Sequence, residues 1–171
     1  MDFSELIKTR YSVRSFSDRK IEGDKLEKII EAAKVAPTAK NMQPQKIYVL
    51  QSEEALKKIN SVCRCIFGAP TVLLITSDTE EEWKNPFTND YHTGDIDCSI
   101  ACTHMMLQAW ELGIGSCWVG FFDPELVKKT FALPAKQKLV AILPLGYPSA
   151  DSKPIAMHST FRPMSEMVKC L

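Results

Sequence analysis

The segment TRYSVRSFSDRK, residues 9–20, has residue types and spacing that suit an anion-binding site. Arg10 and Arg14 flank Ser12 at intervals of two residues, and side chains at i and i+2 of an extended segment point to the same side. Two guanidinium groups and a hydroxyl facing one spot would suit a bound anion. The alternative interpretation is a solvated surface that follows a short helix.

The segment APTAKNMQPQ, residues 36–45, offers polar groups without a nucleophile or a general base. A helix is expected to end at Pro37, and Thr38, Asn41 and Gln43 follow as hydrogen-bond donors and acceptors. These groups would suit a heteroaromatic ring or its polyol chain. The alternative is an ordinary helix-to-strand loop.

The segment GIGSCWVGFFD, residues 113–123, places Gly120 between apolar residues, where the backbone could approach a flat ligand closely. A buried strand end is the alternative. The sequence has no G-x-G-x-x-G after an expected strand, no Walker A motif and no nucleophile elbow. A nicotinamide coenzyme held in a Rossmann crevice is therefore not supported.

Composition narrows the class of protein and of partner. The 171 residues, 45% hydrophobic and 25% charged, predict one globular domain over residues 1–171. Twenty-one basic residues balance 21 acidic ones, so no nucleic-acid partner is expected. Without a signal peptide or a long apolar run, we expect a cytoplasmic protein and no membrane partner. The six cysteines match neither zinc nor iron–sulfur spacings, so we expect no metal site.

The hydrophobic pattern alternates helices with strands, which indicates α/β or α+β layering. Asp24 and Glu27 resemble a capping box. The elements that we expect are helices at 2–10, 23–37, 52–62, 95–112 and 123–133, and strands at 46–50, 70–76, 116–121 and 138–146.

Two features of these elements bear on the assembly and on the site. The helix at 95–112 is apolar except for one polar stripe of Asp97, His104, Gln108 and Glu111, so we expect it to be mostly buried. The last 25 residues carry apolar side chains with little periodicity and would suit a tail that wraps across another subunit.

Five segments, in chain order, resemble motifs of the nitroreductase family of FMN-dependent oxidoreductases. RYSVRSF is similar to the R-x-S-x-R stretch after the first helix, and APTAKNMQPQ to A-P-S-x-x-N-x-Q-P. DIDCSIACTHMMLQAWELGIGSCWVGF is similar to the central helix and the following strand, D-x-G…L-x-A…G-L-G-x-C-W-x-G. LPLGYP resembles the closing strand, and FRPMSEMV resembles the tail R-x-P-x-E-x-V.

The resemblance implies an α+β fold, with a mixed β-sheet flanked by helices and a C-terminal tail exchanged in a homodimer. It implies that Arg10 and Ser12 hold the FMN 5′-phosphate with a basic tail residue, Arg162 or else Lys153. It places Arg14 at the pyrimidine edge of the ring and assigns the 37–41 loop to the other subunit. The cofactor-binding set that it implies is Arg10, Tyr11, Ser12, Arg14, Pro37, Thr38, Ala39, Asn41, Gln43, Trp118, Gly120, Phe121 and Arg162.

The resemblance also implies an enzyme that takes two electrons from NADH or NADPH and passes them to a nitroaromatic, a quinone or a similar acceptor. The cycle would be ping-pong, with no obligatory catalytic side chain because the flavin carries the chemistry. The alternatives are an FMN-binding or sensing protein that turns over nothing, and a flavin reductase or dehalogenase of narrow specificity.

This sequence departs from the family pattern at several positions. Thr38 replaces a serine but keeps the hydroxyl, Gln45 replaces the usual tryptophan, and Asp97 replaces a glycine of the central helix. The segment 77–94 matches no family motif that we identify. It is expected either to shape the substrate entrance or to be a solvated loop.

Overall fold

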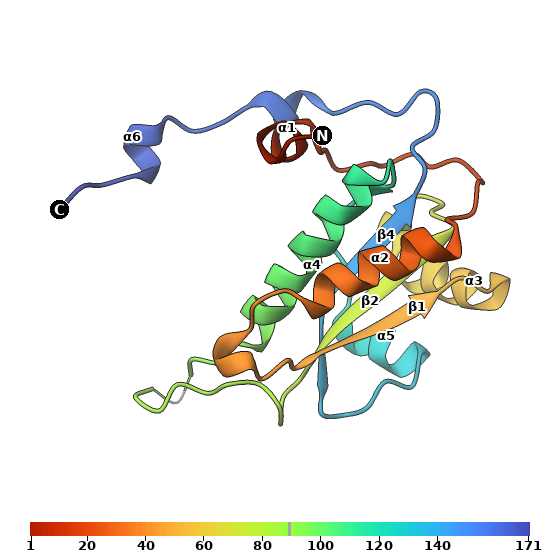
Figure 1. The fold of residues 1–171 in the computed structure, drawn as a ribbon. Helices are drawn as coiled ribbons and strands as arrows, with labels where there is room; N and C mark the ends of the chain where they lie inside the picture. The colour runs from red at the N-terminus through yellow and green to blue at the C-terminus, as the bar shows by residue number, and fades with distance from the viewer. Residues whose placement is uncertain (89) are drawn as a thin grey trace.

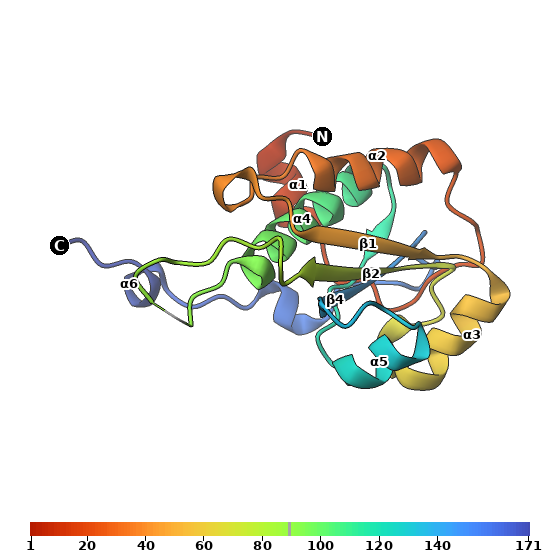
Figure 2. The same cartoon turned by 90° about the horizontal axis from the view of Figure 1, so that it is seen from below.

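A four-stranded β-sheet with helices on both faces forms the fold (Figures 1 and 2). The computed structural model describes residues 1–88 and 90–171. The elements in chain order are α1 (Phe3–Thr9), α2 (Gly23–Lys34), the short 3-10 helix η1 (Ala39–Asn41), β1 (Gln45–Leu50), α3 (Glu53–Val62), η2 (Arg64–Ile66), β2 (Thr71–Asp78), α4 (Gly94–Glu111), β3 (Gly115–Ser116), α5 (Pro124–Thr130), β4 (Gln137–Gly146), η3 (Ala156–Ser159) and α6 (Met164–Met167).

The sheet has the strand order β1-β2-β4-β3, and each neighbouring pair of these strands is antiparallel. A parallel bridge between Ser12 and Ser116 adds the segment after α1 to the β3 edge, so the sheet is mixed at that edge. The predicted α+β class with a mixed sheet flanked by helices is confirmed.

The core lies in two layers, one on each face of the sheet. Strand side chains alternate between faces, so Leu73 and Ile75 of β2 point toward α2 and α4, whereas Val72 and Leu74 point toward α3 and α5. All residues of β2 are buried, as its continuous apolar run predicts. The predicted buried helix over 95–112 is confirmed by α4, which packs between α2 and the sheet.

The predicted capping box at the start of α2 is wrong. The helix begins at Gly23, and its N-cap is Glu22, which makes no side-chain cap bond. Glu22 instead accepts hydrogen bonds from the hydroxyl of Tyr147 and from Arg19. The bond from Tyr147, with help from Arg19, lowers the pKa of Glu22 to about 2. With Glu22 as the N-cap, Asp24 lies in the first turn of α2 rather than at the cap.

The strand predicted over 116–121 is mostly absent. Only Gly115–Ser116 forms β3, and beyond it Val119 makes a single bridge to Ile142. The interruption lies opposite Pro144, whose carbonyl accepts from the Cys117 N–H. Because proline has no N–H to return, the ladder cannot continue there.

The two ends of the polar stripe on α4 differ in burial. Asp97 is only 2% exposed, whereas Glu111 at the other end of the stripe is exposed. The carboxylate is buried because another part of the chain covers and binds it, as the site below shows.

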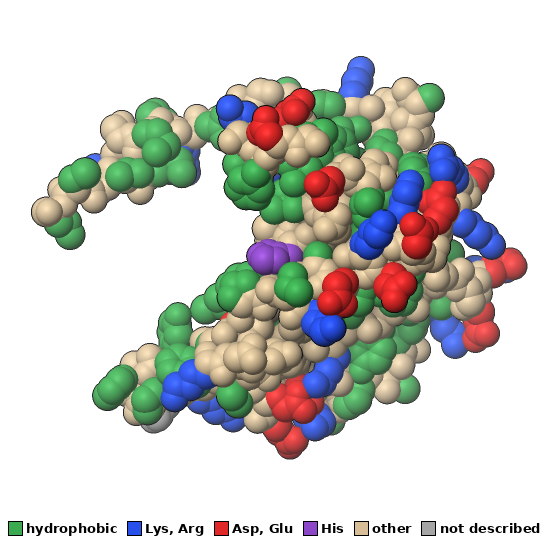
Figure 3. All heavy atoms as spheres, viewed as in Figure 1, with side chains coloured by type: hydrophobic (Ala, Val, Ile, Leu, Met, Phe, Trp, Pro, Cys, Tyr) green, Lys and Arg blue, Asp and Glu red, His purple; other side chains and the backbone are tan. Residues whose placement is uncertain are grey.

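The C-terminal tail runs from β4 past α1 and then away from the body of the molecule (Figure 1). Figure 3 shows a wide hollow between this tail and the opposite end of the molecule, with apolar side chains along the tail. Its large exposed hydrophobic side chains are Ile155, Met157, Phe161, Met164, Met167, Val168 and Leu171. Within the described part of the chain, no helix combines the length and apolar character needed to cross a membrane.

Candidate functional site

The arginine-rich segment leaves α1 in extended conformation and is held against the sheet edge. Arg10 caps α1 with extended backbone angles, and its N–H donates to the Leu6 carbonyl. The N–H of Val13 donates to the Ser116 carbonyl at 2.9 Å, beside the bridge between Ser12 and Ser116. Arg10, Ser12 and Arg14 therefore share the extended spacing that the sequence predicts.

A glycine allows this close approach of the segment to β3. A Cβ added to Gly115 would lie 2.6 Å from Cγ2 of Val13, which is fully buried. Any side chain at 115 would push Val13 outward together with its neighbours Ser12 and Arg14. The packing of the core thus sets the position of the two polar side chains.

A cavity of about 560 Å³ lies between this segment and the tail. Its volume is in the range of small-molecule and cofactor sites. Of the described residues that line it, three are cationic and none carries a carboxylate. The arginine cavity, as we call it, is lined by Ile7, Lys8, Arg10, Tyr11, Ser12, Arg14, Ile155, Met157, His158, Ser159 and Phe161.

Arg10, which lines this cavity, carries an unsatisfied hydrogen-bond donor. Its Nη1 is buried and has no hydrogen-bond partner among the described residues. The Nη1 of Arg14 donates to the Ser12 carbonyl at 3.3 Å, and the Arg14 side chain is otherwise exposed. A buried donor without a partner is costly, and an anion would satisfy it. The residues present therefore fit a phosphate group.

Cys117 lies close to the same cationic groups. Burial raises the pKa of its thiol, while Arg14, Ser12 and Arg10 act in the opposite direction. The net shift is upward, so the thiol is neutral near pH 7. Cys117 therefore supplies no nucleophile to this site.

Tyr11 connects the arginine cavity to α4 and to the tail. Its ring contacts Trp110 edge-on, with centroids 5.2 Å apart, and lies 6.3 Å from His158. Its hydroxyl is 3.1 Å from the Ser152 hydroxyl. These contacts hold η3 against α1, so the tail forms one wall of the cavity.

The two basic residues expected from the tail do not line the arginine cavity of their own chain. The Arg162 side chain is 81% exposed and lies 3.9 Å from Glu166, and Lys153 is also exposed. Phe161 does line the cavity. One chain by itself therefore does not bring Arg162 to Arg10 and Ser12.

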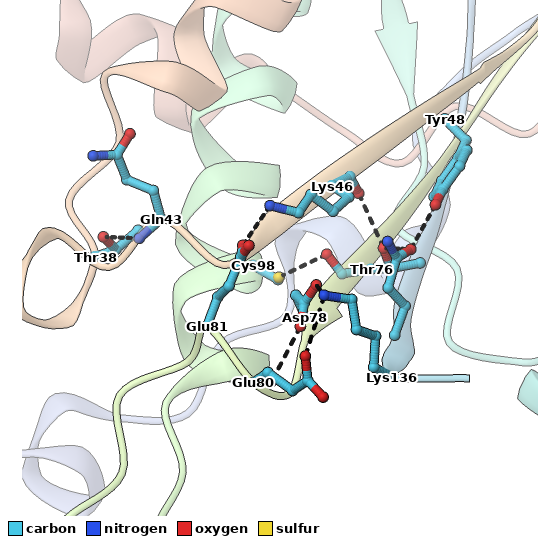
Figure 4. A network of polar contacts seen from close by, with 11 residues as sticks. Thr38, Gln43, Lys46, Tyr48, Thr76, Asp78, Glu80, Glu81, Cys98 and Lys136 are labelled. Atoms are coloured by element: carbon cyan, nitrogen blue, oxygen red, sulfur yellow. Dashed lines mark hydrogen bonds and ion pairs between the residues drawn. The ribbon is translucent and has the colours of Figure 1, made fainter. Parts of the chain in front are cut away.

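The 37–43 loop has a strained backbone. Three residues that are not glycine, Lys40, Asn41 and Gln43, have φ values of 49°, 57° and 51°. Left-handed backbone costs roughly 1–2 kcal/mol for each such residue. Inside the loop, the Gln43 N–H donates to the Thr38 hydroxyl at 3.1 Å, as Figure 4 shows.

Asp97 supplies the contact that joins this loop to the core. Its Oδ1 accepts from the Ala39 N–H at 3.0 Å, and its Oδ2 accepts from the Thr93 hydroxyl at 2.9 Å. The sequence shows the aspartate, but it does not show the contact. Ala39 and Asp97 are 58 positions apart, so only the folded chain brings them together.

The 37–43 loop and the arginine cavity lie at opposite ends of α4 (Figure 1). Asp97, near the start of α4, binds the loop, whereas Trp110, near its end, donates to Thr9 at the end of α1. Thirteen residues at 1.5 Å each separate these two anchors by about 20 Å along the helix. Within one chain, the structure therefore does not bring the residues of the arginine cavity together with the polar residues of the 37–43 loop.

The remaining predicted residues lie on the segment that leads from β3 to α5. Trp118 is 37% exposed, Phe121 is 82% exposed and Gly120 is exposed. An unpaired aromatic side chain exposed to this degree is available to a flat ligand or to another chain.

The 77–94 segment protrudes beyond the start of α4. Trp83 and Tyr91 contact each other edge-on at 6.5 Å, and Phe87 is almost fully exposed. At its base, Glu82 packs onto Gly94, where an added Cβ would lie 2.0 Å from the carboxylate. Asn89, part of the predicted substrate entrance, lies outside the described residues.

Comparison with known proteins finds the same family that the motifs indicate. The model of the nitroreductase family matches residues 7–67 and 63–147. The FMN reductase [NAD(P)H] of Bacillus subtilis is 27% identical over 158 residues, which span 82% of this chain and 64% of that protein.

Solved structures agree in both fold and sequence. A nitroreductase family protein from Clostridium difficile 630 has a TM-score of 0.92 and 41% identity, covering 99% of this chain and 98% of the other. An FMN-dependent nitroreductase from Clostridium difficile R20291 has a TM-score of 0.74 and 26% identity, with 94% and 98% covered. The family model spans most of the chain, and the first of these structures matches nearly all of it. The chain belongs to the nitroreductase family.

Proposed function

We propose that this protein is an FMN-dependent oxidoreductase that uses NADH or NADPH, with its flavin phosphate in the arginine cavity. The observation that carries the proposal is the Arg10 Nη1, which is buried without a partner among the described residues, while Arg10 itself lines a cavity whose described lining residues include no carboxylate. The names of relatives, FMN reductase [NAD(P)H] and FMN-dependent nitroreductase, support the cofactor and the electron donor.

The bound flavin would supply the chemistry, receiving two electrons from the coenzyme and passing them to an electron-poor acceptor, a nitroaromatic or a quinone, in a ping-pong cycle. The residues of the chain bind and orient. Arg10 and the Ser12 hydroxyl would hold the phosphate, and Arg14 would stabilise negative charge on the reduced ring. Trp118 and the backbone at Gly120 and Phe121 would contact the ring.

The experiment is to purify the protein, record its visible spectrum and measure oxidation of NADH and NADPH with menadione or a nitroaromatic. Flavin absorption together with steady-state turnover is the expected result. Flavin absorption without turnover on either coenzyme would favour the binding or sensing alternative. A colourless protein that does not take up added FMN would contradict the proposal.

A homodimer is part of this proposal, because one chain holds only part of the site. The arginine cavity and the 37–43 loop lie about 20 Å apart along α4. Pro37, Thr38, Ala39, Asn41 and Gln43 would therefore reach a flavin held by Arg10 of a second copy. The exposed apolar tail would cross onto that copy, which would bring Arg162 near its phosphate.

A mixed dimer tests this arrangement. One subunit carries Arg10→Ala and the other carries Asn41→Ala, each with its own affinity tag. The two are co-expressed, and the dimer that carries both tags is isolated. If each site combines Arg10 of one subunit with Asn41 of the other, one site of the mixed dimer is intact and binds FMN with wild-type affinity. If both residues act within one chain, each site carries one of the two substitutions, and neither site binds FMN with wild-type affinity. Sedimentation as a flavin-loaded monomer of 19.3 kDa would also contradict the proposal.

A further inference from the structure

We propose that Asp97 is the positioning residue that holds the 37–43 loop in its flavin-binding conformation, a proposal that rests on the proposed function. Asp97 accepts the Ala39 N–H at 3.0 Å, and this is the side-chain contact from α4 to the loop. This chain therefore stabilises its loop with a carboxylate.

The loop needs such an anchor because its conformation is locally unfavourable. Lys40, Asn41 and Gln43 all adopt positive φ without being glycine. A strained backbone persists where contacts with the surrounding structure hold it in place. The bond from Gln43 to Thr38 lies within the loop, so it stabilises the shape of the loop without attaching it to the core.

The carboxylate itself is stably placed. It is 2% exposed and lies in the first turns of α4, where the helix dipole favours a negative charge. The Thr93 hydroxyl donates to Oδ2, and the Asp97 N–H donates to the Thr93 carbonyl. Hydrogen bonds from the Ala39 N–H and the Thr93 hydroxyl hold the side chain in place. It is thus fixed before any flavin binds.

Thr93 extends the same contact to the 77–94 segment. Its N–H and its hydroxyl both approach the Trp83 carbonyl, at 3.1 and 3.3 Å. Asp97 therefore connects the base of the protruding segment with the 37–43 loop. The loop and the segment share one buried anchor at the start of α4.

Loss of the anchor should reduce the fraction of molecules whose loop is ready to bind. The apparent dissociation constant rises as this fraction falls. We expect Asp97→Ala to weaken FMN binding about tenfold, and turnover at saturating FMN to return close to the wild-type value. We expect Asp97→Asn, which can keep an oxygen toward Ala39, to stay within about threefold of wild type.

Asp78→Ala is the matched control. Asp78 is also a buried carboxylate, 1% exposed, at the end of β2, and it binds Lys136 and the Glu80 N–H (Figure 4). Burial favours a higher pKa for Asp78, but the bonds from Lys136 and Glu80 lower it below its usual value. The side chain does not touch the 37–43 loop, so the variant should lose stability without loss of FMN affinity.

The measurements are FMN titration of the apoprotein and amide hydrogen exchange over residues 37–43 without FMN. The proposal expects faster exchange and weaker binding in Asp97→Ala, near wild-type values in Asp97→Asn, and neither change in Asp78→Ala. Unchanged exchange in Asp97→Ala, or faster exchange with unchanged FMN affinity, would overturn it.

Two other results, an unfolded variant and a wild-type protein that does not bind FMN, each have a defined consequence. If Asp97→Ala does not fold, Thr93→Val removes one partner of the carboxylate at equal volume and should show the same two effects at about two- to threefold. If the wild-type protein does not bind FMN, the proposed function fails. The exchange comparison between the Asp97 and Asp78 variants then still decides whether Asp97 holds the loop.

Discussion

Replacing Arg10 by alanine is expected to weaken FMN binding by about ten- to a hundredfold, because a charge-assisted hydrogen bond contributes about 1.5–3 kcal/mol. The apoprotein should lose little thermal stability. Its Arg10 Nη1 is buried without a partner among the described residues, so truncation removes a group that costs free energy in the apoprotein. Weaker binding without a lower melting temperature distinguishes a ligand contact from a structural one.

Fluorescence titration of the apoprotein and thermal unfolding without FMN measure the two effects. Arg19→Ala is the control, because Arg19 belongs to the same basic segment but lies over the Tyr147 ring at 4.0 Å, outside the arginine cavity. Arg19→Ala should leave FMN affinity unchanged. Equal affinity of wild type and Arg10→Ala would refute the placement of the phosphate.

Replacing Arg14 by methionine is expected to lower the midpoint potential of the bound flavin by several tens of millivolts. Arg14 is exposed on the wall of the arginine cavity, with one hydrogen bond to the Ser12 carbonyl. A cation at the pyrimidine edge favours the reduced flavin over the oxidised one, because two-electron reduction adds negative charge there. For a two-electron couple, about 30 mV corresponds to about 1.4 kcal/mol, a reasonable size for one partly solvated charge.

Spectroelectrochemistry on Arg14→Met measures the potential, and stopped-flow mixing with NADH measures hydride transfer, which should slow. Oxidised FMN should bind nearly as well as in wild type, because only interactions that differ between the two states shift the potential. An unchanged potential with weaker FMN binding would assign Arg14 to the phosphate. If neither quantity changes, Arg14 is a solvated surface residue.

The sequence by itself determined the order and type of the main elements, because periodicity and caps are local properties. The continuous apolar run of β2 predicts burial on both faces. The side chains of Asp2, Ser52 and Asp123, residue types common at N-caps, accept helix N–H groups at the start of α1, α3 and α5. It also predicted that Arg10, Ser12 and Arg14 face the same side, since spacing in an extended segment is enough to align three side chains.

Only the tertiary structure decided features that depend on partners distant in sequence. The Glu22 carboxylate binds Tyr147 instead of capping α2, and β3 ends early because Pro144 of the neighbouring strand has no N–H to give. Tyr147 and Pro144 lie too far along the chain from Glu22 and β3 for a local sequence pattern to reveal either contact.

The same holds for the candidate site. The unpartnered Nη1 of Arg10, the burial of Asp97 against Ala39 and the separation of the two groups along α4 all follow from packing between segments that are far apart in the chain. Hydrophobic burial is non-directional and sets which surfaces meet, whereas hydrogen bonds depend on positions within a few tenths of an ångström. The types of side chain at this site are therefore visible in the sequence, but their partners exist only in the folded chain.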